Sequence, residues 1–217
     1  MTTAGNRSRL HQVAANSGRF LESLGVPVAN LVRAQQVHGT QVAVVSARHA
    51  GRSLPRIDAL VARDRRVLCS VTVADCLPIF LYDPKRAAFG VVHGGWRSLQ
   101  QGILRQVVTR LQASFLSLPE HLLVGIGPGI SPCHYAVGDD VAAKFRNYAP
   151  CLAVRDHGQM YLDLKRVAAM QLQACAVRPE HIEISPECTY CRADKYFSFR
   201  RDHPAVVEAM LAVIGFR

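Results

Sequence analysis

Two histidines and one cysteine stand beside turn signals, where apolar and β-branched runs begin or end. They are His38 in QVHGTQVAVV, Cys76 in ADCLP and His93 in VVHGGW. One cysteine with two histidines is an attested ligand set for catalytic zinc, which takes three protein ligands and leaves a fourth position for water or substrate. The residue types therefore predict a metal centre, although their long and irregular spacing adds no support.

The same residues fit a second chemistry that needs no metal. Cys76 would be a thiolate nucleophile and His93 its base. Asp75 cannot be assumed to complete a triad, because neighbouring residues on a strand point to opposite faces. The sequence by itself leaves the metal centre and the Cys–His pair open.

Two motifs near the C-terminus carry weaker signals. Arg200 and Arg201, followed by Asp202, fit either a phosphate site built on guanidinium forks or a surface salt-bridge cluster. Cys188 and Cys191 form a single C-x-x-C motif. Because no second pair accompanies it, a structural zinc ribbon is not expected there.

Strand-like runs surround each of the three candidate ligands. Asp83-Pro84 marks a tight turn between strand-like residues 60–82 and 88–93, which predicts a hairpin. The β-branched residues around His38 predict either two strands or one strand with a bulge. Residues 122–130 predict a buried strand that ends in a plain Gly-Pro-Gly turn, since no Lys follows to make a phosphate loop. Residues 182–184 and 196–200 are also predicted to be strands.

Helical periodicity appears in several other segments. Residues 1–25 predict one or two short helices with a break near residues 16–18. Apolar residues then repeat every three or four positions over residues 96–115, which predicts one helix of about five turns. Its N-terminus lies just past His93, where an anionic ligand would be favoured. Further helices are expected from Asp139 and over residues 163–175, the latter with Asp163 as N-cap, whereas residues 205–216 fit a helix or a strand.

Composition and charge bound the class of protein. The chain has 217 residues and is 49% hydrophobic, so we expect one domain with a substantial core. Its net charge of +10 permits anionic partners, but the basic residues are scattered and nucleic acid is not the favoured partner. Seven cysteines without a signal-peptide pattern favour a reducing cytoplasm. No apolar run reaches the roughly 18 residues that a membrane span needs, so a soluble protein is expected.

Six motifs in order give the chain a resemblance to a known family. QVHG, ADCLP, VHGGWR, GIGPGISPCHYAVG, YLDL and CTYCRADKYFSFRRD together resemble the YfiH/laccase-domain family, also called the multicopper polyphenol oxidoreductase or purine nucleoside phosphorylase family. The resemblance covers the chain from about Asn6 to its end. It implies an α+β fold, a single-domain α/β/β/α layered sandwich with mixed sheets over residues 1–217, related to the cysteine hydrolase fold of cytotoxic necrotizing factor.

The resemblance also implies ligands and activities. The family's zinc ligands fall on His38, Cys76 and His93, and Cu²⁺ is the alternative metal. The family is associated with phosphorolysis of purine nucleosides (adenosine, inosine, guanosine and methylthioadenosine) and with deamination of adenosine. The family motif HAGWRG reads HGGWRS here, which keeps the ligand, and the family's usual Arg-, Gly- and Ser-rich opening segment is missing.

These implications give a mechanistic hypothesis. Zinc would orient a water for attack on the amine-bearing carbon of adenine, with Asp75 or Asp202 as the proton-transfer group. In phosphorolysis, Arg200 and Arg201, with Arg97 behind them, would hold phosphate against the anomeric carbon of the ribose.

Three other functions stay open at this stage. The first is a cysteine hydrolase that edits peptidoglycan precursors. The second is a laccase-like copper polyphenol oxidoreductase, which would need ligands for several coppers. The third is a nucleic-acid-binding module without turnover.

Overall fold

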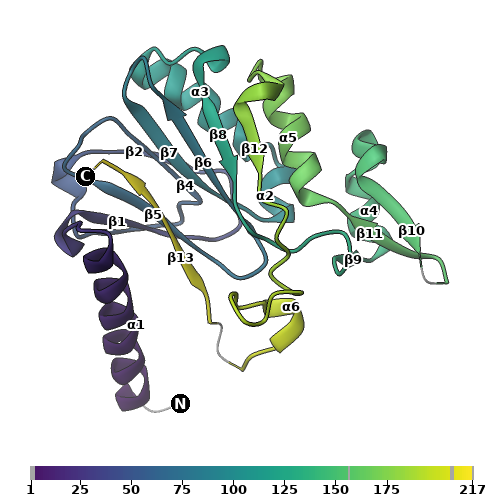
Figure 1. Ribbon diagram of the computed structural model, residues 1–217, viewed down its shortest axis with the longest axis horizontal. Helices are drawn as coiled ribbons and strands as arrows, with labels where there is room; N and C mark the ends of the chain where they lie inside the picture. The colour runs from purple at the N-terminus through teal and green to yellow at the C-terminus, as the bar shows by residue number, and fades with distance from the viewer. Residues whose placement is uncertain (1–2, 156, 206–207, 217) are drawn as a thin grey trace.

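Two β-sheets packed face to face form the centre of the protein, with helices on the outer side of each (Figure 1). The computed structural model describes residues 3–155, 157–205 and 208–216. The order of layers is α/β/β/α, so the α+β layered fold predicted from the sequence is confirmed.

The larger sheet has six strands, in the spatial order β12-β8-β6-β7-β4-β2. Its central pairs β8–β6, β6–β7 and β7–β4 are antiparallel, and the two edge pairs are parallel. In chain order the strands are β2 (Val42–Val45), β4 (Ala59–Ala62), β6 (Leu77–Asp83), β7 (Ala88–Gly94), β8 (Leu123–Ile126) and β12 (Ile182–Ile184).

The second sheet has four strands in the order β13-β5-β1-β3, and a small antiparallel sheet has the order β10-β11-β9. The four strands are β1 (Leu31–Gln35), β3 (Ser53–Pro55), β5 (Leu68–Val73) and β13 (Met210–Gly215). The small sheet contains β9 (Ala136–Val137), β10 (Leu152–Arg155) and β11 (Gln159–Leu162).

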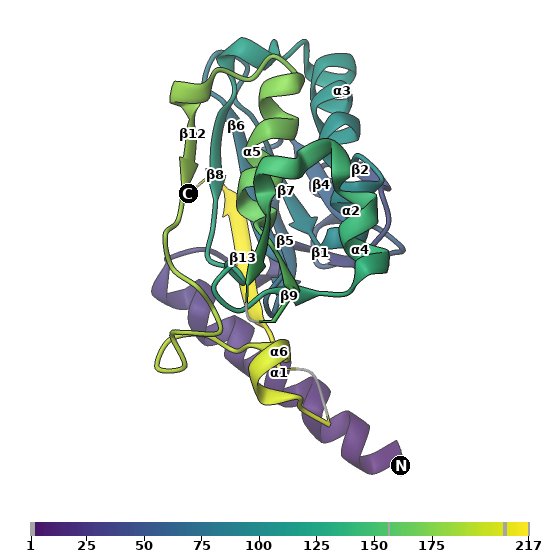
Figure 2. The same cartoon turned by 90° about the vertical axis from the view of Figure 1, so that its right-hand side faces the viewer.

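Helices lie on both outer faces. The α-helices are α1 (Thr3–Ser23), α2 (Trp96–Gln100), α3 (Ile103–Phe115), α4 (Asp139–Lys144), α5 (Leu164–Ala174) and α6 (Phe199–Asp202). Short 3-10 turns connect elements at Val28–Asn30, Ala47–His49, Pro119–His121, Arg146–Cys151 and Pro179–His181. Figure 2 shows α2, α3 and α5 over the larger sheet, while α1 extends away from the body of the molecule. Among the described residues, no helix combines the length and the apolarity that a membrane crossing requires.

Strand alternation divides the interior into two main cores. In β4, Ala59 and Val61 pack toward the helices, whereas Leu60 and Ala62 pack toward the second sheet. This is the period of two that strand geometry imposes, and both faces are apolar because both are covered. A third, smaller core joins Leu21 near the end of α1 to the outer face of the second sheet.

Three secondary-structure predictions are wrong. Helix α1 runs without the expected break near residues 16–18, where the Arg19 guanidinium donates to the side chain of Asn16 (2.6 Å). The helix predicted over residues 96–115 is divided into α2 and α3 at Gly102, whose φ of +81° lies in the left-handed region. Residues 199–202 form the short helix α6 instead of a strand, because the Ser198 hydroxyl caps it by accepting from the Arg201 N–H.

Other predictions are confirmed. Strands β6 and β7 form the expected hairpin, and the run around His38 divides into β1 and β2, which join different sheets. Helix α5 has Asp163 as its N-cap, with the carboxylate accepting from the Arg166 N–H. The ambiguous tail is strand β13, which pairs antiparallel with β5.

Candidate active site

The three predicted ligands meet at one end of the space between the two sheets. His38 follows β1, Cys76 precedes β6 and His93 lies near the end of β7. One ligand atom from each lies within 4.8 Å of the other two, and the imidazole rings are 4.7 Å apart, edge to face. The structure thus brings together side chains that are 17 to 55 residues apart in sequence.

Two residues at the site have unusual backbone conformations. His38 has a φ of 56° and Asp75 a φ of 82°, in the left-handed region that non-glycine residues rarely adopt. Such residues cost about 1–3 kcal/mol each and persist only where the surroundings hold them. For His38, the surrounding group that holds it is the carboxylate of Asp58.

Asp58 is the functional residue that sequence reasoning missed. Its carboxylate is fully buried and accepts hydrogen bonds from the backbone N–H groups of Val37 (3.1 Å), His38 (2.9 Å) and Gly39 (2.8 Å). It also bonds Nδ1 of His93 at 2.9 Å, which leaves Nε2 of that ring for a metal. Burial raises the pKa of Asp58, but the hydrogen bonds from His93 and the backbone outweigh it and lower this pKa. Nothing in the local motif RIDALV distinguishes this carboxylate from a surface aspartate.

The side chains around the three ligands fit a bound metal ion. Nδ1 of His38 is buried and has no hydrogen-bond partner. Such an orphaned nitrogen is costly unless an unseen group binds it. Gly95 leaves the necessary room, because a Cβ there would lie 2.8 Å from Nδ1 of His38 and 3.2 Å from Sγ of Cys76. Two imidazoles and one thiolate suit zinc or copper.

Without metal, the same cluster would hold a reactive thiolate. Burial raises the pKa of the Cys76 thiol, but the two imidazoles outweigh this effect and lower the pKa to about 7. Burial lowers the pKa of His93, whereas Asp58 and Cys76 raise it, with a net value of about 9. Metal binding requires a deprotonated Cys76, which its lowered pKa favours, and a neutral His93, whose raised pKa means that the ion must displace a proton from the ring.

A cleft of about 660 Å³ opens beside the three ligands. This volume lies within the range of pockets for small molecules. Its walls combine the three ligands and Asp75 with aromatic and cationic side chains from distant segments, namely Trp96, Arg97, Tyr135, Phe199 and Arg200. The cleft thus places aromatic surfaces and positive charge beside the predicted metal site.

The candidate anion-binding arginines divide into two groups. Arg97 and Arg200 line the cleft and are stiffened by aromatic rings, with Arg97 4.5 Å from the Trp96 ring and Arg200 5.4 Å from the Tyr135 ring. Arg201 is not among the residues that line it. Its guanidinium donates to backbone carbonyls at 189, 190 and 196 and to both oxygens of the Asp202 carboxylate. A phosphate role for Arg201 stays a prediction that these contacts do not favour.

Of the two candidate proton-transfer groups, Asp75 lies in the cleft. Its Oδ1 accepts from the Thr189 hydroxyl (2.6 Å) and its Oδ2 from the backbone N–H of Arg200 (2.7 Å). Each oxygen keeps a second lone pair that can face a substrate. Asp202 instead caps the backbone N–H of Ser198 and pairs with Arg201.

The helix and turn that were considered as anion sites have other roles. Helix α2 has only five residues, so its end carries little of the dipole expected for a long helix. The turn at residues 127–129 packs against the Cys76 loop, with the Ile130 N–H donating to the Asp75 carbonyl (2.9 Å). A Cβ at Gly129 would lie 2.5 Å from Leu77, so the plain turn predicted there requires glycine for close packing.

The layered fold, the His–Cys–His cluster and the adjoining cleft define a class of protein. Comparison of this chain with known protein families identifies that class. Residues 4–217 match the family described as multi-copper polyphenol oxidoreductase laccase. The chain therefore belongs to this family, which confirms the YfiH/laccase-domain resemblance.

Individual relatives carry a more specific name. The protein called purine nucleoside phosphorylase YlmD from Geobacillus stearothermophilus is 35% identical over 94% of this chain and 79% of its own. The human protein called purine nucleoside phosphorylase LACC1 is 28% identical over 88% of this chain and 44% of its own. The crystal structure of that YlmD superimposes with a TM-score of 0.89 at 34% identity, over 94% of this chain and 80% of that one. Bacillus licheniformis YfiH gives a TM-score of 0.90 at 28% identity, over 94% and 81%.

Proposed function

We propose that this protein is a zinc-dependent purine nucleoside phosphorylase that also deaminates adenosine. The observation that carries the proposal is the convergence, in one cleft, of a metal-ligand cluster, two arginines and three aromatic side chains. The names of the relatives from Geobacillus stearothermophilus and humans support the same activity. Adenosine, inosine, guanosine and methylthioadenosine are the proposed substrates.

Arg97 and Arg200 are proposed to bind phosphate. Each side chain is braced by an aromatic ring, and Arg200 also donates one N–H to the carbonyl of Ala136 (2.8 Å). The remaining guanidinium N–H groups are free to form the paired hydrogen bonds that phosphate oxygens accept. A phosphate oxygen would form a bond to C1′ of the ribose as the bond from C1′ to the purine nitrogen breaks.

The aromatic side chains are proposed to bind the purine. Phe199 lines the cleft and 51% of its surface is exposed, so its ring is accessible to a base. Stacking of a base on an aromatic ring contributes about 1–3 kcal/mol. Tyr135 and Trp96 provide further apolar surface near the arginines.

His38, Cys76 and His93 would hold the zinc ion, with Asp58 fixing the tautomer and orientation of His93. When bound, zinc supplies a Lewis-acidic centre that lowers the pKa of a coordinated water toward neutrality. Asp75 is the proposed proton-transfer group, because it lines the cleft and its carboxylate is fixed by Thr189.

Product analysis tests the proposal directly. The purified protein is incubated with adenosine in the presence and absence of inorganic phosphate, and bases, nucleosides and ribose 1-phosphate are quantified. Phosphorolysis predicts ribose 1-phosphate only when phosphate is present, in an amount equal to adenine plus hypoxanthine. Deamination predicts inosine, which accumulates when phosphate is absent. Arg97→Ala and Arg200→Ala should raise the KM for phosphate and leave deamination nearly unchanged. Absence of all these products in zinc-loaded protein would refute the proposal.

Metal depletion, Cys76→Ser and oxygen consumption distinguish the other predicted functions. A cysteine hydrolase would keep its activity in metal-depleted protein and lose it in Cys76→Ser. A laccase-like oxidoreductase would be loaded with copper and consume oxygen with a phenolic substrate. Either result, in protein that forms no ribose 1-phosphate or inosine, would replace the phosphorylase proposal.

A further inference from the structure

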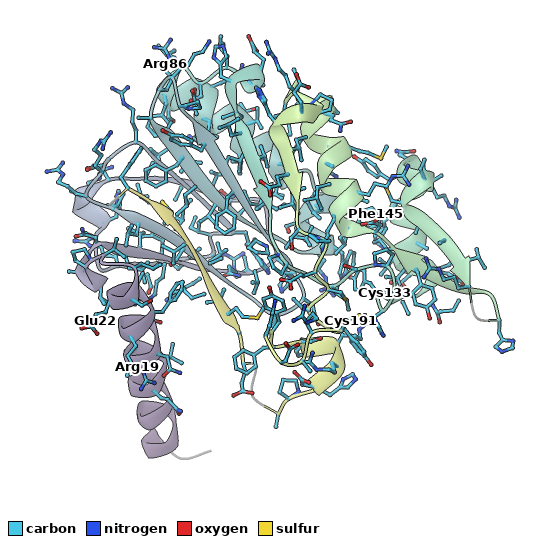
Figure 3. The ribbon with its side chains drawn as sticks, viewed as in Figure 1. Arg19, Glu22, Arg86, Cys133, Phe145 and Cys191 are labelled. Atoms are coloured by element: carbon cyan, nitrogen blue, oxygen red, sulfur yellow. The ribbon has the colours of Figure 1, made fainter. Side chains whose placement is uncertain are left out.

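A second group of metal-binding side chains lies outside the cleft. Cys133 and His134 come from the loop between β8 and β9, and Cys188 and Cys191 come from the loop that follows β12. Figure 3 shows the side chains of Cys133 and Cys191 next to each other, near β9 and α6. The absence of a second C-x-x-C pair predicts no zinc ribbon here, but the fold brings Cys133 and His134, more than fifty residues earlier in the sequence, next to the motif.

Distances within this group match the edges of a metal-centred tetrahedron. The Cys133 and Cys191 sulfurs are 3.7 Å apart, and the Cys191 sulfur is 3.3 Å from Nδ1 of His134. Bond lengths of about 2.3 Å to sulfur and about 2.0 Å to nitrogen give tetrahedral edges of about 3.8 and about 3.5 Å. All four ligand atoms lie within 4.8 Å of one another. A small inward movement would therefore suffice to bind one ion.

The surroundings of Cys188 favour negatively charged sulfur. The Ser131 backbone N–H donates to the Cys188 sulfur at 3.3 Å. The buried Lys165 ammonium donates to the Ser131 hydroxyl (3.1 Å) and interacts electrostatically with Cys133 and Cys188. Three thiolates around a divalent ion leave one net negative charge, which this ammonium would balance.

The histidine of the group is held in place. Its ring stacks on that of Tyr190, between the two cysteines of the C-x-x-C motif, with centroids 4.0 Å apart and planes inclined by 14°.

We propose that Cys133, His134, Cys188 and Cys191 bind one structural zinc ion, separate from the ion at His38, Cys76 and His93. Three cysteines with one histidine form a closed set of four ligands, typical of structural zinc.

The proposed ion would join the two loops that build one wall of the cleft. Thr189, inside the C-x-x-C motif, donates to Asp75, and Arg201 donates to the carbonyls of Thr189 and Tyr190. Arg200, the residue before Arg201, donates to the carbonyl of Ala136 in β9, where the other loop ends. Zinc at the second group would thus fix the wall that carries Arg200, but the metal site itself does not depend on the function proposed for the cleft.

Metal analysis of the full chain, purified under reducing conditions and equilibrated with Zn²⁺, tests the proposal. We expect two zinc ions per chain in the native protein, one in Cys191→Ser and one in Cys76→Ser. The double variant should bind none. Cys175→Ser is the matched control, because this half-buried cysteine lies outside both groups, and it should keep two ions.

Cobalt substitution identifies the ligands independently of the number of zinc ions bound per chain. Most of the thiolate-to-Co²⁺ charge-transfer absorption should come from the second group, which holds three thiolates, and should be lost in Cys191→Ser or Cys133→Ser. Both cysteines are exposed, so folding of these variants, followed by circular dichroism, should be preserved. A zinc content that Cys191→Ser does not lower, or a Cys133–Cys191 disulfide in place of the metal, would overturn the proposal, whereas loss of an ion in Cys191→Ser but not in Cys76→Ser would contradict only the zinc site proposed for the cleft.

Discussion

Replacement of Asp58 by asparagine tests whether one buried carboxylate organises the metal site. The four groups that bond it are all donors: Oδ1 faces the His38 N–H and Nδ1 of His93, and Oδ2 faces the N–H groups of Val37 and Gly39. An amide has one oxygen and one NH₂ group. Whichever way the substituted amide is oriented, its NH₂ group therefore faces two donors.

The structure sets the size of the expected effect. Each buried donor left without an acceptor costs about 1–3 kcal/mol, and one or two donors lose their acceptor depending on the His93 tautomer, so the free energy of unfolding should fall by about 1–6 kcal/mol. If the NH₂ group faces His93, the ring can accept at Nδ1 only by carrying its proton on Nε2, where it blocks metal binding. Loss of such a partner of a metal-bound histidine typically weakens metal affinity about 10–100-fold, or about 1.4–2.7 kcal/mol.

Competition with a chromophoric zinc chelator measures the affinity of the His38–Cys76–His93 site, and denaturant unfolding measures stability. The comparison is made in a Cys191→Ser background, so that the proposed second ion does not contribute. Asp83→Asn is the matched control. Asp83 is also fully buried and accepts two backbone N–H bonds, but it lies at the far end of β6, about 20 Å along the strand from Cys76.

Asp83→Asn should leave zinc affinity unchanged. One of its oxygens has no partner, so the NH₂ group can take that position and the stability cost should be smaller than for Asp58→Asn. The reasoning about Asp58 is refuted if Asp58→Asn binds zinc as tightly as the native site. It is also refuted if both variants lose the same stability and the same affinity.

Three further predictions concern the cleft and its metal ligands. Gly95→Ala should lower zinc affinity at least about tenfold, because the added methyl group would lie 2.8 Å from Nδ1 of His38. Gly125→Ala, which adds a methyl group in open space, should bind zinc normally in the same chelator assay. Equal affinities of the two variants would contradict this. Phe199→Ala should raise the KM for nucleosides about 5–150-fold, which corresponds to about 1–3 kcal/mol of lost stacking. Phe199→Tyr should keep the native KM. An unchanged KM for Phe199→Ala in steady-state kinetics would exclude a stacking role. In metal-depleted protein, alkylation of Cys76, measured by peptide mass spectrometry, should increase as pH rises through about 7, because the neighbouring imidazoles lower the pKa of its thiol. Bound zinc should protect Cys76 from alkylation. A midpoint near pH 9 would contradict the lowered pKa.

The three candidate ligands beside the cleft could be predicted from sequence because of their local setting. His38, Cys76 and His93 each stand beside a turn at a strand end, and functional side chains concentrate where a rigid sheet passes into a loop. The hairpin of β6 and β7 and the cap at Asp163 were predictable for the same reason, because local periodicity and turn chemistry determine them. Their convergence on one point follows from sheet topology, which periodicity does not contain.

Elements that depend on the rest of the chain were predicted less well. The break at Gly102 interrupts an apolar repeat that continues on both sides of it, so the repeat alone predicts one helix. The segment at Phe199 has strand-like composition, but the Ser198 cap and the hydrogen bond from the Arg200 N–H to Asp75 make it a helical turn. The contact with Asp75 involves a residue 125 positions earlier in the sequence, so local patterning cannot predict it.

By itself, the sequence predicted the family and the layered fold class through its six ordered motifs, and it predicted His38, Cys76 and His93 as candidate ligands through their residue types beside turns. Only the tertiary structure decided that Asp58 organises the site and that Cys133 and His134 meet the C-x-x-C motif. The reason is physical: a hydrogen bond or a metal site depends on separations of a few ångströms in space. Those separations depend on how the whole chain folds, and the local sequence does not encode them.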